Sequence, residues 1–199
     1  MQRQPSKPVI RACVLAAGSS ARFGKPKLLQ RFRGKPLLQH ALLAAQEVCK
    51  GKVLLVVGHG KNAIGEASAG LADDIVVNAD HELGMGTSIA AGVRACPEDT
   101  AALLILLADQ PLITTVHLKN IIGAWHGGPD EIVTSSCDGI FSPPILFAKT
   151  AFQALRELEG DEGARRILTN KAFQLTNIEF AAAGLDIDTP EDLQRLNRD

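Results

Sequence analysis

The chain has 199 residues, of which 46% are hydrophobic and 22% are charged, and its formal net charge is −1. This length suits one α/β domain over residues 1–199, which can bury about 70% of the surface that the unfolded chain exposes. The balanced charge and the lack of an apolar run of about 18 residues predict no bulk nucleic-acid binding and no membrane attachment.

The N-terminal segment and the cysteines indicate the compartment. Residues 1–8 are polar and basic and lack the apolar stretch of a signal peptide, so we expect a flexible start and a cytoplasmic protein. The four cysteines are widely separated, which fits neither a zinc site nor the disulfide pattern of a secreted protein. We therefore predict reduced, mostly buried thiols.

The first predicted strand leads into a loop that is rich in glycine and cations. Residues 9–16 are apolar and partly β-branched enough for a buried strand, and Gly18 and Gly24 suit tight turns. Backbone N–H groups exposed in such a loop form an anion-binding concavity. The cations of the loop are Arg22, Lys25 and Lys27. We interpret the loop as a cradle for a nucleoside triphosphate; the simpler alternative is a βα turn with solvated cations.

Two common phosphate-binding motifs do not fit this loop. Lys25 is followed by proline rather than by the hydroxyl residue of a P-loop, and the glycine spacing also differs. Ser20 stands where a dinucleotide-binding fingerprint needs its second glycine.

Strands and helices alternate after an irregular passage over residues 28–35. The predicted helices cover residues 36–49, about 61–71, 87–95 and 114–125, and the predicted strands cover residues 53–57, 75–77 and 101–107. This alternation predicts a three-layer α/β/α, Rossmann-like fold whose parallel strands are joined by right-handed crossovers. Ligands are then expected at the carboxyl ends of the strands.

The second half of the chain departs from this rhythm. Residues 132–137 and 144–147 are predicted to pair around Asp138-Gly139, which makes the mostly parallel sheet a mixed one. The remaining predicted elements are helices over 149–158 and 161–168, a strand over 173–178 and a terminal helix that opens at Thr189-Pro190.

A family resemblance begins in the glycine-rich loop. The sequence Leu15-Ala16-Ala17-Gly18-x-Ser20-x-Arg22-Phe23-Gly24-x-x-Lys27 resembles the signature loop of the nucleotidyltransferase superfamily, which has a glycosyltransferase-A-like fold. Four further motifs resemble the molybdenum cofactor cytidylyltransferase branch. They are Asn78 with Gly84-Met85-Gly86-Thr87-Ser88 and Gly92, Leu107-Ala108-Asp109-Gln110-Pro111, Gly160-Asp161-x-Gly163-Ala164-Arg165, and Asp186-Ile187-Asp188-Thr189-Pro190-Glu191-Asp192-Leu193.

The resemblance implies a Mg²⁺-dependent nucleotidyltransferase. It would move CMP from CTP to a phosphate acceptor, molybdopterin, and release pyrophosphate. A phosphate monoester is already an oxyanion, so no activated serine or cysteine is needed, and the sequence offers no such arrangement. The alternatives are transfer to a sugar phosphate or another small phosphate, and a non-catalytic nucleotide-binding factor that partners molybdoenzymes in maturation.

Two aspartates are the predicted metal ligands. Asp109 follows the apolar strand 101–107, and Pro111 ends the strand just after it. Asp109 is therefore expected at the carboxyl edge of the sheet. Asp188 is the second ligand by resemblance, and two carboxylates with phosphate oxygens and waters suit Mg²⁺. The alternatives are a polar strand end for Asp109 and a helix start formed by Asp186, Asp188 and Thr189.

The resemblance also assigns the residues around the substrates. Arg22 and Lys27 would bind the triphosphate, and the planar guanidinium of Arg22 can bind two phosphate oxygens at once. Lys25 is a weaker candidate, because the superfamily pattern does not require a lysine at that position. The predicted nucleotide-binding residues are Leu15, Ala16, Ala17, Gly18, Ser20, Lys25, Asn78, Gly84 and Ser88. For Asn78 the alternative is a local turn role, and for Ser88 it is a plain helix cap.

Two positions bear on the acceptor and the base. Asp161 either caps a helix or faces the acceptor, as its family context suggests. Pro143 stands where the family shows the histidine of a Gly-His-Pro motif, which removes a donor. Ala17 stands where guanylyl-transferring relatives carry glycine, so CTP is expected to be preferred over GTP.

Overall fold

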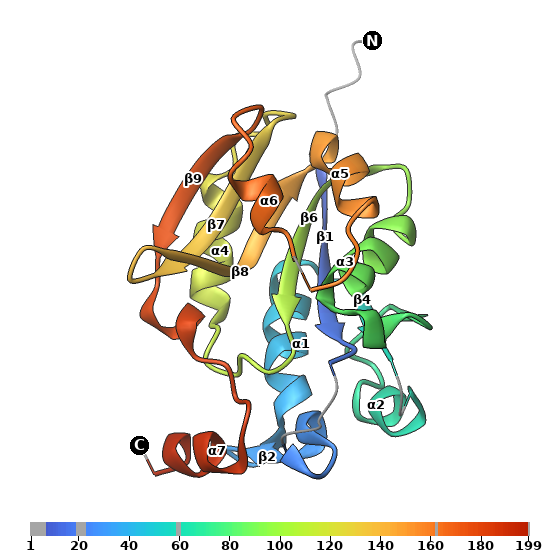
Figure 1. Cartoon of the computed structure of the whole chain (residues 1–199), viewed down its shortest axis with the longest axis vertical. Helices are drawn as coiled ribbons and strands as arrows, with labels where there is room; N and C mark the ends of the chain where they lie inside the picture. Colours follow the sequence, from blue (N-terminus) through green and yellow to red (C-terminus); the bar gives the residue numbers. More distant parts are fainter. Residues whose placement is uncertain (1–6, 19–22, 59–60, 162, 199) are drawn as a thin grey trace.

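A seven-stranded mixed sheet forms the centre of the computed structural model, which describes residues 7–18, 23–58, 61–161 and 163–198 (Figure 1). In sheet order the strands are β5 (Asp74–Val77), β4 (Val53–Val57), β1 (Val9–Ala16), β6 (Thr100–Leu107), β8 (Ile140–Ala148), β7 (Glu131–Cys137) and β9 (Gln174–Glu179). The strand β8 runs antiparallel to both of its neighbours, and the other pairs are parallel. The predicted mixed, mostly parallel sheet is therefore confirmed.

Helices cover both faces of the sheet, because the apolar strands bury alternate residues on opposite sides. In β1, Val14 packs in one core cluster and Cys13 and Leu15 pack in the other. The first cluster includes residues of α1 (Leu37–Val48), α2 (Lys61–Ala67) and α4 (Thr115–Ala124). The second includes residues of α3 (Met85–Arg94), α5 (Phe152–Arg156) and α6 (Arg165–Leu168). This confirms the three-layer α/β/α fold.

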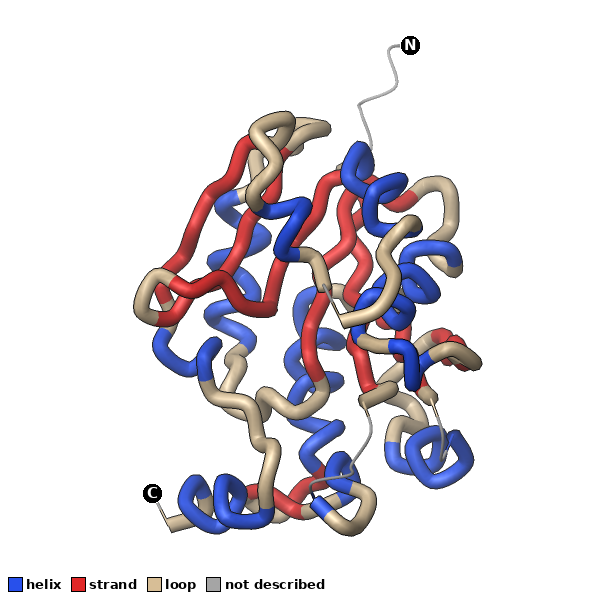
Figure 2. Tube along the Cα trace, viewed as in Figure 1, coloured by secondary structure: helices blue, strands red, loops and turns tan. Residues whose placement is uncertain are grey.

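Several helix ends differ from the prediction. Pro36 precedes α1 as its N-cap instead of opening it, and the Thr114 hydroxyl caps α4 by accepting from the His117 N–H at 3.2 Å. The helix predicted over 161–168 forms only over its second half, since α6 has its N-cap at Ala164 and Asp161 does not cap it. Gly163 has φ +54°, a left-handed conformation that keeps the chain out of the helix until residue 165. The preceding helix is likewise short: a 3₁₀ turn (Lys149–Ala151) leads into α5 (Figure 2).

A third, small core joins the C-terminus to the segment after the glycine-rich loop. That segment contains a 3₁₀ turn (Lys27–Leu29) and a two-stranded hairpin of β2 (Arg31–Phe32) and β3 (Lys35–Pro36). The terminal helix α7 (Pro190–Leu196) lies beside it (Figure 1). The buried residues of this core are Phe23, Phe32, Leu37, Ile187 and Leu193. Because Ile187 is fully buried, its two neighbours in sequence are fixed in position.

The cysteines match the expectation of reduced thiols, since all four are free and two are buried. Burial raises the pKa of Cys49 and of Cys96 to about 11, so both stay protonated at neutral pH. None of the helices in the described ranges combines the length and the hydropathy that crossing a bilayer requires.

Candidate active site

Two carboxylates and one ammonium group from distant parts of the chain meet at the carboxyl end of β6. Lys27 Nζ lies 2.7 Å from Asp109 Oδ2 and 3.3 Å from Asp188 Oδ1. Lys27 is only 9% exposed, and Asp109 and Asp188 are also partly enclosed. The structure therefore brings together the two aspartates predicted as metal ligands and the lysine predicted to bind phosphate.

The backbone explains why Asp188 lies near Asp109, from which it is separated by 78 residues of sequence. The Ile187 N–H donates to the Asp109 carbonyl at 3.1 Å, and the Ile187 side chain is buried in the third core. The helix start follows immediately, with a reciprocal capping box between Thr189 and Asp192. Thr189 thus takes the capping role, and the Asp188 carboxylate is directed to the Lys27 ammonium.

The chemistry of these donors suits a hard divalent cation that is shared with a substrate. Mg²⁺ takes one or two carboxylates and fills its octahedron with phosphate oxygens and waters. Asp109 and Asp188 supply the two carboxylates, and they already converge on one cationic group. In the described parts of the chain no group of three or more metal-binding side chains forms a complete protein cage. A metal held by these two carboxylates would keep coordination positions for phosphate oxygens and waters.

A cavity of about 440 Å³ opens beside this cluster, within the size range of small-molecule sites. Its wall contains these predicted residues: Leu15, Ala17, Gly18, Gly84, Ser88, Asp109, Asp161 and Asp188. It also contains His81, Glu82, Met85 and Leu107, which the sequence did not single out as binding residues. Ala16 instead packs in the core on the opposite face, and Lys25 is exposed outside the wall. Ser20 and Arg22, and with them the predicted phosphate fork, lie outside the described residues.

Asn78 supports this wall from behind. Its side-chain amide donates to Thr87 Oγ1 at 2.9 Å and to Ser88 Oγ at 3.0 Å, and its oxygen accepts from the Asp80 N–H at 3.0 Å. Asn78 is 5% exposed and is not part of the cavity wall. Ser88 lies inside α3, whose N-cap is Gly84, so it does not cap that helix. The amide therefore orients the hydroxyl of Ser88 and the start of α3.

The motif around Gly84 and the motif around Gly160 touch backbone to backbone. A Cβ on Gly84 would lie 2.3 Å from the Gly160 carbonyl carbon, and one on Gly86 would lie 2.8 Å from the Glu159 oxygen. The Gly86 N–H also donates to the Gly160 carbonyl at 2.8 Å. Only glycine permits this approach, which carries Asp161 into the wall of the cavity. Two motifs that are far apart in sequence thus form one structural unit.

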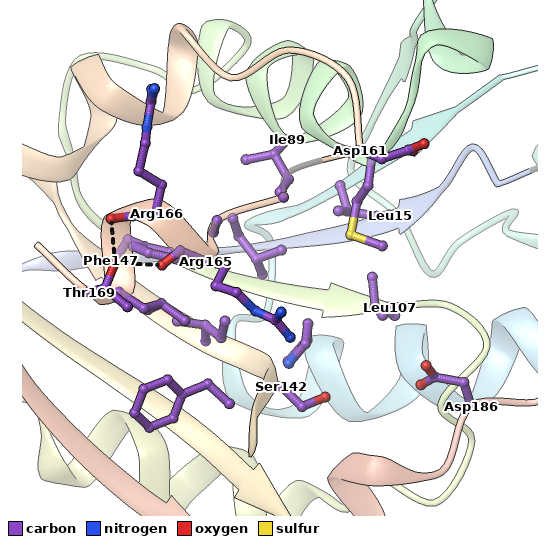
Figure 3. A pocket seen from close by; sticks show the side chains of 18 residues that line it. Leu15, Ile89, Leu107, Ser142, Phe147, Asp161, Arg165, Arg166, Thr169 and Asp186 are labelled. Atoms are coloured by element: carbon purple, nitrogen blue, oxygen red, sulfur yellow. Dashed lines mark hydrogen bonds between the residues drawn. The ribbon is translucent and has the colours of Figure 1, made fainter. Parts of the chain in front are cut away.

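A second and larger cavity of about 890 Å³ adjoins the first (Figure 3). Its wall includes Pro143 and Asp161, the two positions predicted on the acceptor side, and Ser142, Arg165 and Asp186. The two cavities share Leu15, Met85, Leu107 and Asp161. A molecule in one cavity would therefore lie next to a molecule in the other.

Buried polar groups hold the Pro143 segment in place. Ser135 Oγ donates to the Pro144 carbonyl at 2.8 Å, so its own oxygen accepts from His117 Nε2, also at 2.8 Å. The His117 ring stacks on Phe180 with centroids 4.0 Å apart, and burial lowers the pKa of His117. The imidazole is therefore neutral at pH 7 and acts as a fixed donor beneath the cavity wall.

Asp186 was expected only at a helix start, yet its side chain lines the larger cavity. Gln110 Nε2 donates to Asp186 Oδ1 at 2.8 Å and to the Ala183 carbonyl at 3.0 Å. Loss of hydration, and next the negative charge of Asp109, raise the pKa of Asp186 above its ordinary value. The sequence motif that contains Asp188 also contains Asp186 and could have pointed to it. The contact of Asp186 with Gln110, which follows Asp109, becomes apparent only in the folded structure.

Comparison with known proteins identifies the family to which the chain belongs. Residues 12–176 match the family model described as a MobA-like NTP transferase domain. The chain belongs to this family. It is therefore a nucleotidyltransferase of the MobA-like type, as its paired aspartates and adjoining cavities also indicate.

The MobA-like chain resembles individual proteins along nearly its whole length. It is 33% identical to the Purine catabolism protein PucB of Bacillus subtilis, over 96% of this chain and 97% of that protein. The crystal structure of Rv0371c from Mycobacterium tuberculosis superposes with a TM-score of 0.84 at 25% identity, covering 98% of this chain and all of that one. A second structure of Rv0371c is a complex with manganese, with a TM-score of 0.79, 25% identity and coverage of 95% and 98%. A relative with this fold thus binds a divalent metal.

Proposed function

We propose that this chain is a Mg²⁺-dependent cytidylyltransferase that moves CMP from CTP to the phosphate of molybdopterin and releases pyrophosphate. The observation that carries the proposal is the junction of the two cavities. The wall of the smaller cavity includes Gly18, Asp109 and Asp188, and the larger cavity begins at residues that both walls share. This arrangement supports a reaction in which a nucleotide and an acceptor lie side by side, next to two carboxylates that suit a metal ion.

The reaction needs positioning and charge neutralisation more than covalent help from the protein. An oxygen of the acceptor phosphate attacks the α-phosphorus of CTP, and the bond from that phosphorus to the bridging oxygen of the pyrophosphate breaks. A bound Mg²⁺, held by Asp109 and Asp188, would offset the negative charge of the triphosphate. The Lys27 ammonium can move from Asp109 and Asp188 to the α-phosphate, where it acts as a point charge. We assign Arg22 to bind two phosphate oxygens through its guanidinium.

Pyrophosphate release with a panel of acceptors tests this function. We expect CTP and Mg²⁺ to give pyrophosphate when molybdopterin is present and little when a sugar phosphate replaces it. Efficient transfer to a sugar phosphate would favour the alternative acceptor class. A chain that binds CTP but releases no pyrophosphate with any acceptor would be a nucleotide-binding maturation factor. The name of the Bacillus relative places that protein in purine catabolism and specifies neither nucleotide nor acceptor.

Ala17→Gly is expected to weaken the discrimination against GTP. Ala17 is 5% exposed, and its side chain lies in the wall of the nucleotide cavity. Removal of its methyl group gives a purine more room, and such a change is worth about 1–3 kcal/mol, or roughly five- to a hundredfold in discrimination. Competition binding of CTP and GTP to both proteins measures it. A wild-type chain that binds GTP clearly more tightly than CTP would contradict the assignment of the base.

Pro143→His is expected to improve the use of molybdopterin. Proline offers no side-chain donor and no N–H, whereas histidine at this point of the larger cavity could donate to the pterin or its phosphate. One such hydrogen bond is worth about 1–3 kcal/mol, or roughly five- to a hundredfold in the KM for the acceptor. Steady-state kinetics with molybdopterin varied at saturating CTP measure the change. An unchanged or higher KM, in a variant that retains its Tm, would remove residue 143 from the acceptor contacts.

A further inference from the structure

Four of the described residues line both cavities, and they differ in how far their side chains can move. They are Leu15, Leu107, Asp161 and Met85, and the first three gather at one side of the larger cavity (Figure 3). Leu15 and Leu107 belong to the central strands β1 and β6 and pack with the second core cluster, and Asp161 carries a charge. Met85 opens α3, and its apolar side chain is 43% exposed. It is therefore the shared apolar residue that a ligand can cover from either side.

The backbone on both sides of Met85 is held in place. Gly84, the N-cap of α3, has φ +126°, and the Gly86 N–H donates to the Gly160 carbonyl at 2.8 Å. A Cβ on either glycine would collide with the backbone of residues 159–160. The helix that follows packs on the sheet through its buried residues. Movement at residue 85 is therefore limited to its side chain.

A methionine side chain suits a wall that two ligands share. It is unbranched, has three rotatable bonds and carries a polarisable sulfur, so it adapts its shape to the group beside it. The first ligand that covers the exposed part of Met85 restricts its rotamers, and the second ligand then meets a wall that is already ordered. Through this one side chain each ligand makes the other bind more tightly.

We propose that Met85 contacts both substrates and couples their binding: its side chain packs against the nucleotide in the smaller cavity and against the acceptor in the larger one. This rests on the proposed function only in taking the two cavities as the sites of the two substrates. The identity of the acceptor does not enter, because the contact is apolar and forms where the cavities join. A contact shared at this junction also keeps the two reacting groups close together.

Methyl NMR with CMP as the probe tests the coupling without turnover, because CMP lacks the leaving pyrophosphate. The chain contains two methionines, Met1 and Met85, so ¹³C labelling of the methionine ε-methyl groups gives one signal from the junction, which Met85→Leu assigns. We expect saturating CMP to shift this signal and to restrict the motion of the methyl group. CMP should also shift the δ1-methyl of Ile89, which lies four residues further along α3 and lines the larger cavity but not the smaller one.

Met85→Ala should bind CMP about three- to tenfold more weakly and lose most of the Ile89 response at saturating CMP. Met85→Leu keeps the apolar volume, so it should retain most of the affinity and of the response. Leu83→Ala is the matched control, because Leu83 is an even more exposed apolar residue two positions earlier that lines neither cavity. It should change neither quantity.

Two results of this experiment would overturn the proposal. One is a Met85 signal that saturating CMP does not move, and the other is an Ile89 response that is as large in Met85→Ala as in the wild-type chain. Equal Tm values for Met85→Ala and Leu83→Ala show that folding is not the cause of the difference between them.

Kinetics separate this inference from the proposed function. If CTP releases no pyrophosphate with any acceptor, the proposed function fails, while the response of Met85 and Ile89 to CMP still supports the coupling of the two cavities. If transfer occurs, Met85→Ala should raise the KM for CTP and the KM for the acceptor about three- to tenfold each. The wild-type chain should bind that acceptor about fivefold more tightly with CMP than without it, and Met85→Ala should bring this ratio close to one. An unchanged acceptor KM, or an unchanged ratio, would contradict the role of Met85 and leave nucleotidyl transfer standing.

Discussion

Asp109→Asn is expected to lower kcat about a hundredfold or more with CTP and saturating Mg²⁺. The substitution keeps the size of the side chain and removes the charge that would bind metal, an interaction concentrated in the transition state. Asp109 also pairs with Lys27 at 2.7 Å, but Asp188 lies 3.3 Å from the same ammonium, so Lys27 keeps a charged partner in the variant. The Tm should therefore fall by only a few degrees, at about 2–4 °C per kcal/mol for a chain of this size.

Two further measurements test the role of Asp109: the affinity for Mn²⁺, and the turnover of a control variant at a distant carboxylate. Mn²⁺ affinity, measured with CTP present, should fall in parallel with kcat. Asp99→Asn makes the same chemical change at an exposed carboxylate that pairs with Arg11 far from both cavities, so it should leave turnover unchanged. Near-normal turnover in Asp109→Asn would remove this aspartate from the reaction.

The strands could be predicted from sequence because both faces of the sheet are buried. All of β4 and the buried part of β1 (residues 12–16) are apolar, and the predicted bounds 9–16 and 53–57 match the structure. Short helices such as α6 could not be predicted, because four residues carry too little periodicity and the backbone conformation of Gly163 decides where they begin. Propensity alone does not define such an element.

The position of a site residue could be predicted where it directly follows a single strand. It could not be predicted where it depends on contacts between segments that are far apart in sequence. Asp109 follows the apolar strand β6, so its position could be inferred from the strand alone. That Arg165 lines the larger cavity depends on the direction of its side chain from a short helix, and the position of Asp186 depends on Gln110. The contact of Gly84 with Gly160 also joins two motifs whose sequences carry no sign of the pairing.

Lys27→Met is expected to lower kcat about a hundredfold and to raise the affinity for a divalent metal in the absence of nucleotide. The Lys27 ammonium lies between Asp109 and Asp188, at 2.7 Å and 3.3 Å, and so takes the place of a cation. A metal that binds both carboxylates must displace it. Two charges 4 Å apart interact by about 4 kcal/mol at an effective dielectric of 20, and the exposure of the carboxylates reduces this figure. We expect Mn²⁺ to bind the variant about ten- to a hundredfold more tightly.

The opposite changes in turnover and metal affinity distinguish this role from a structural one. Methionine keeps the apolar stem of a side chain that is 9% exposed, but it leaves Asp109 and Asp188 to repel each other. The Tm of Lys27→Met should therefore fall without metal, and Mn²⁺ should raise it more than it raises the Tm of the wild-type chain. Electron paramagnetic resonance of free Mn²⁺ measures the affinity, with Lys35→Met on the exposed hairpin as the control. If Mn²⁺ binds Lys27→Met no more tightly than the wild-type chain, Lys27 does not compete with the metal. If it binds more tightly while kcat falls, the same ammonium holds the carboxylates together before the substrate arrives and is released to the phosphates afterwards.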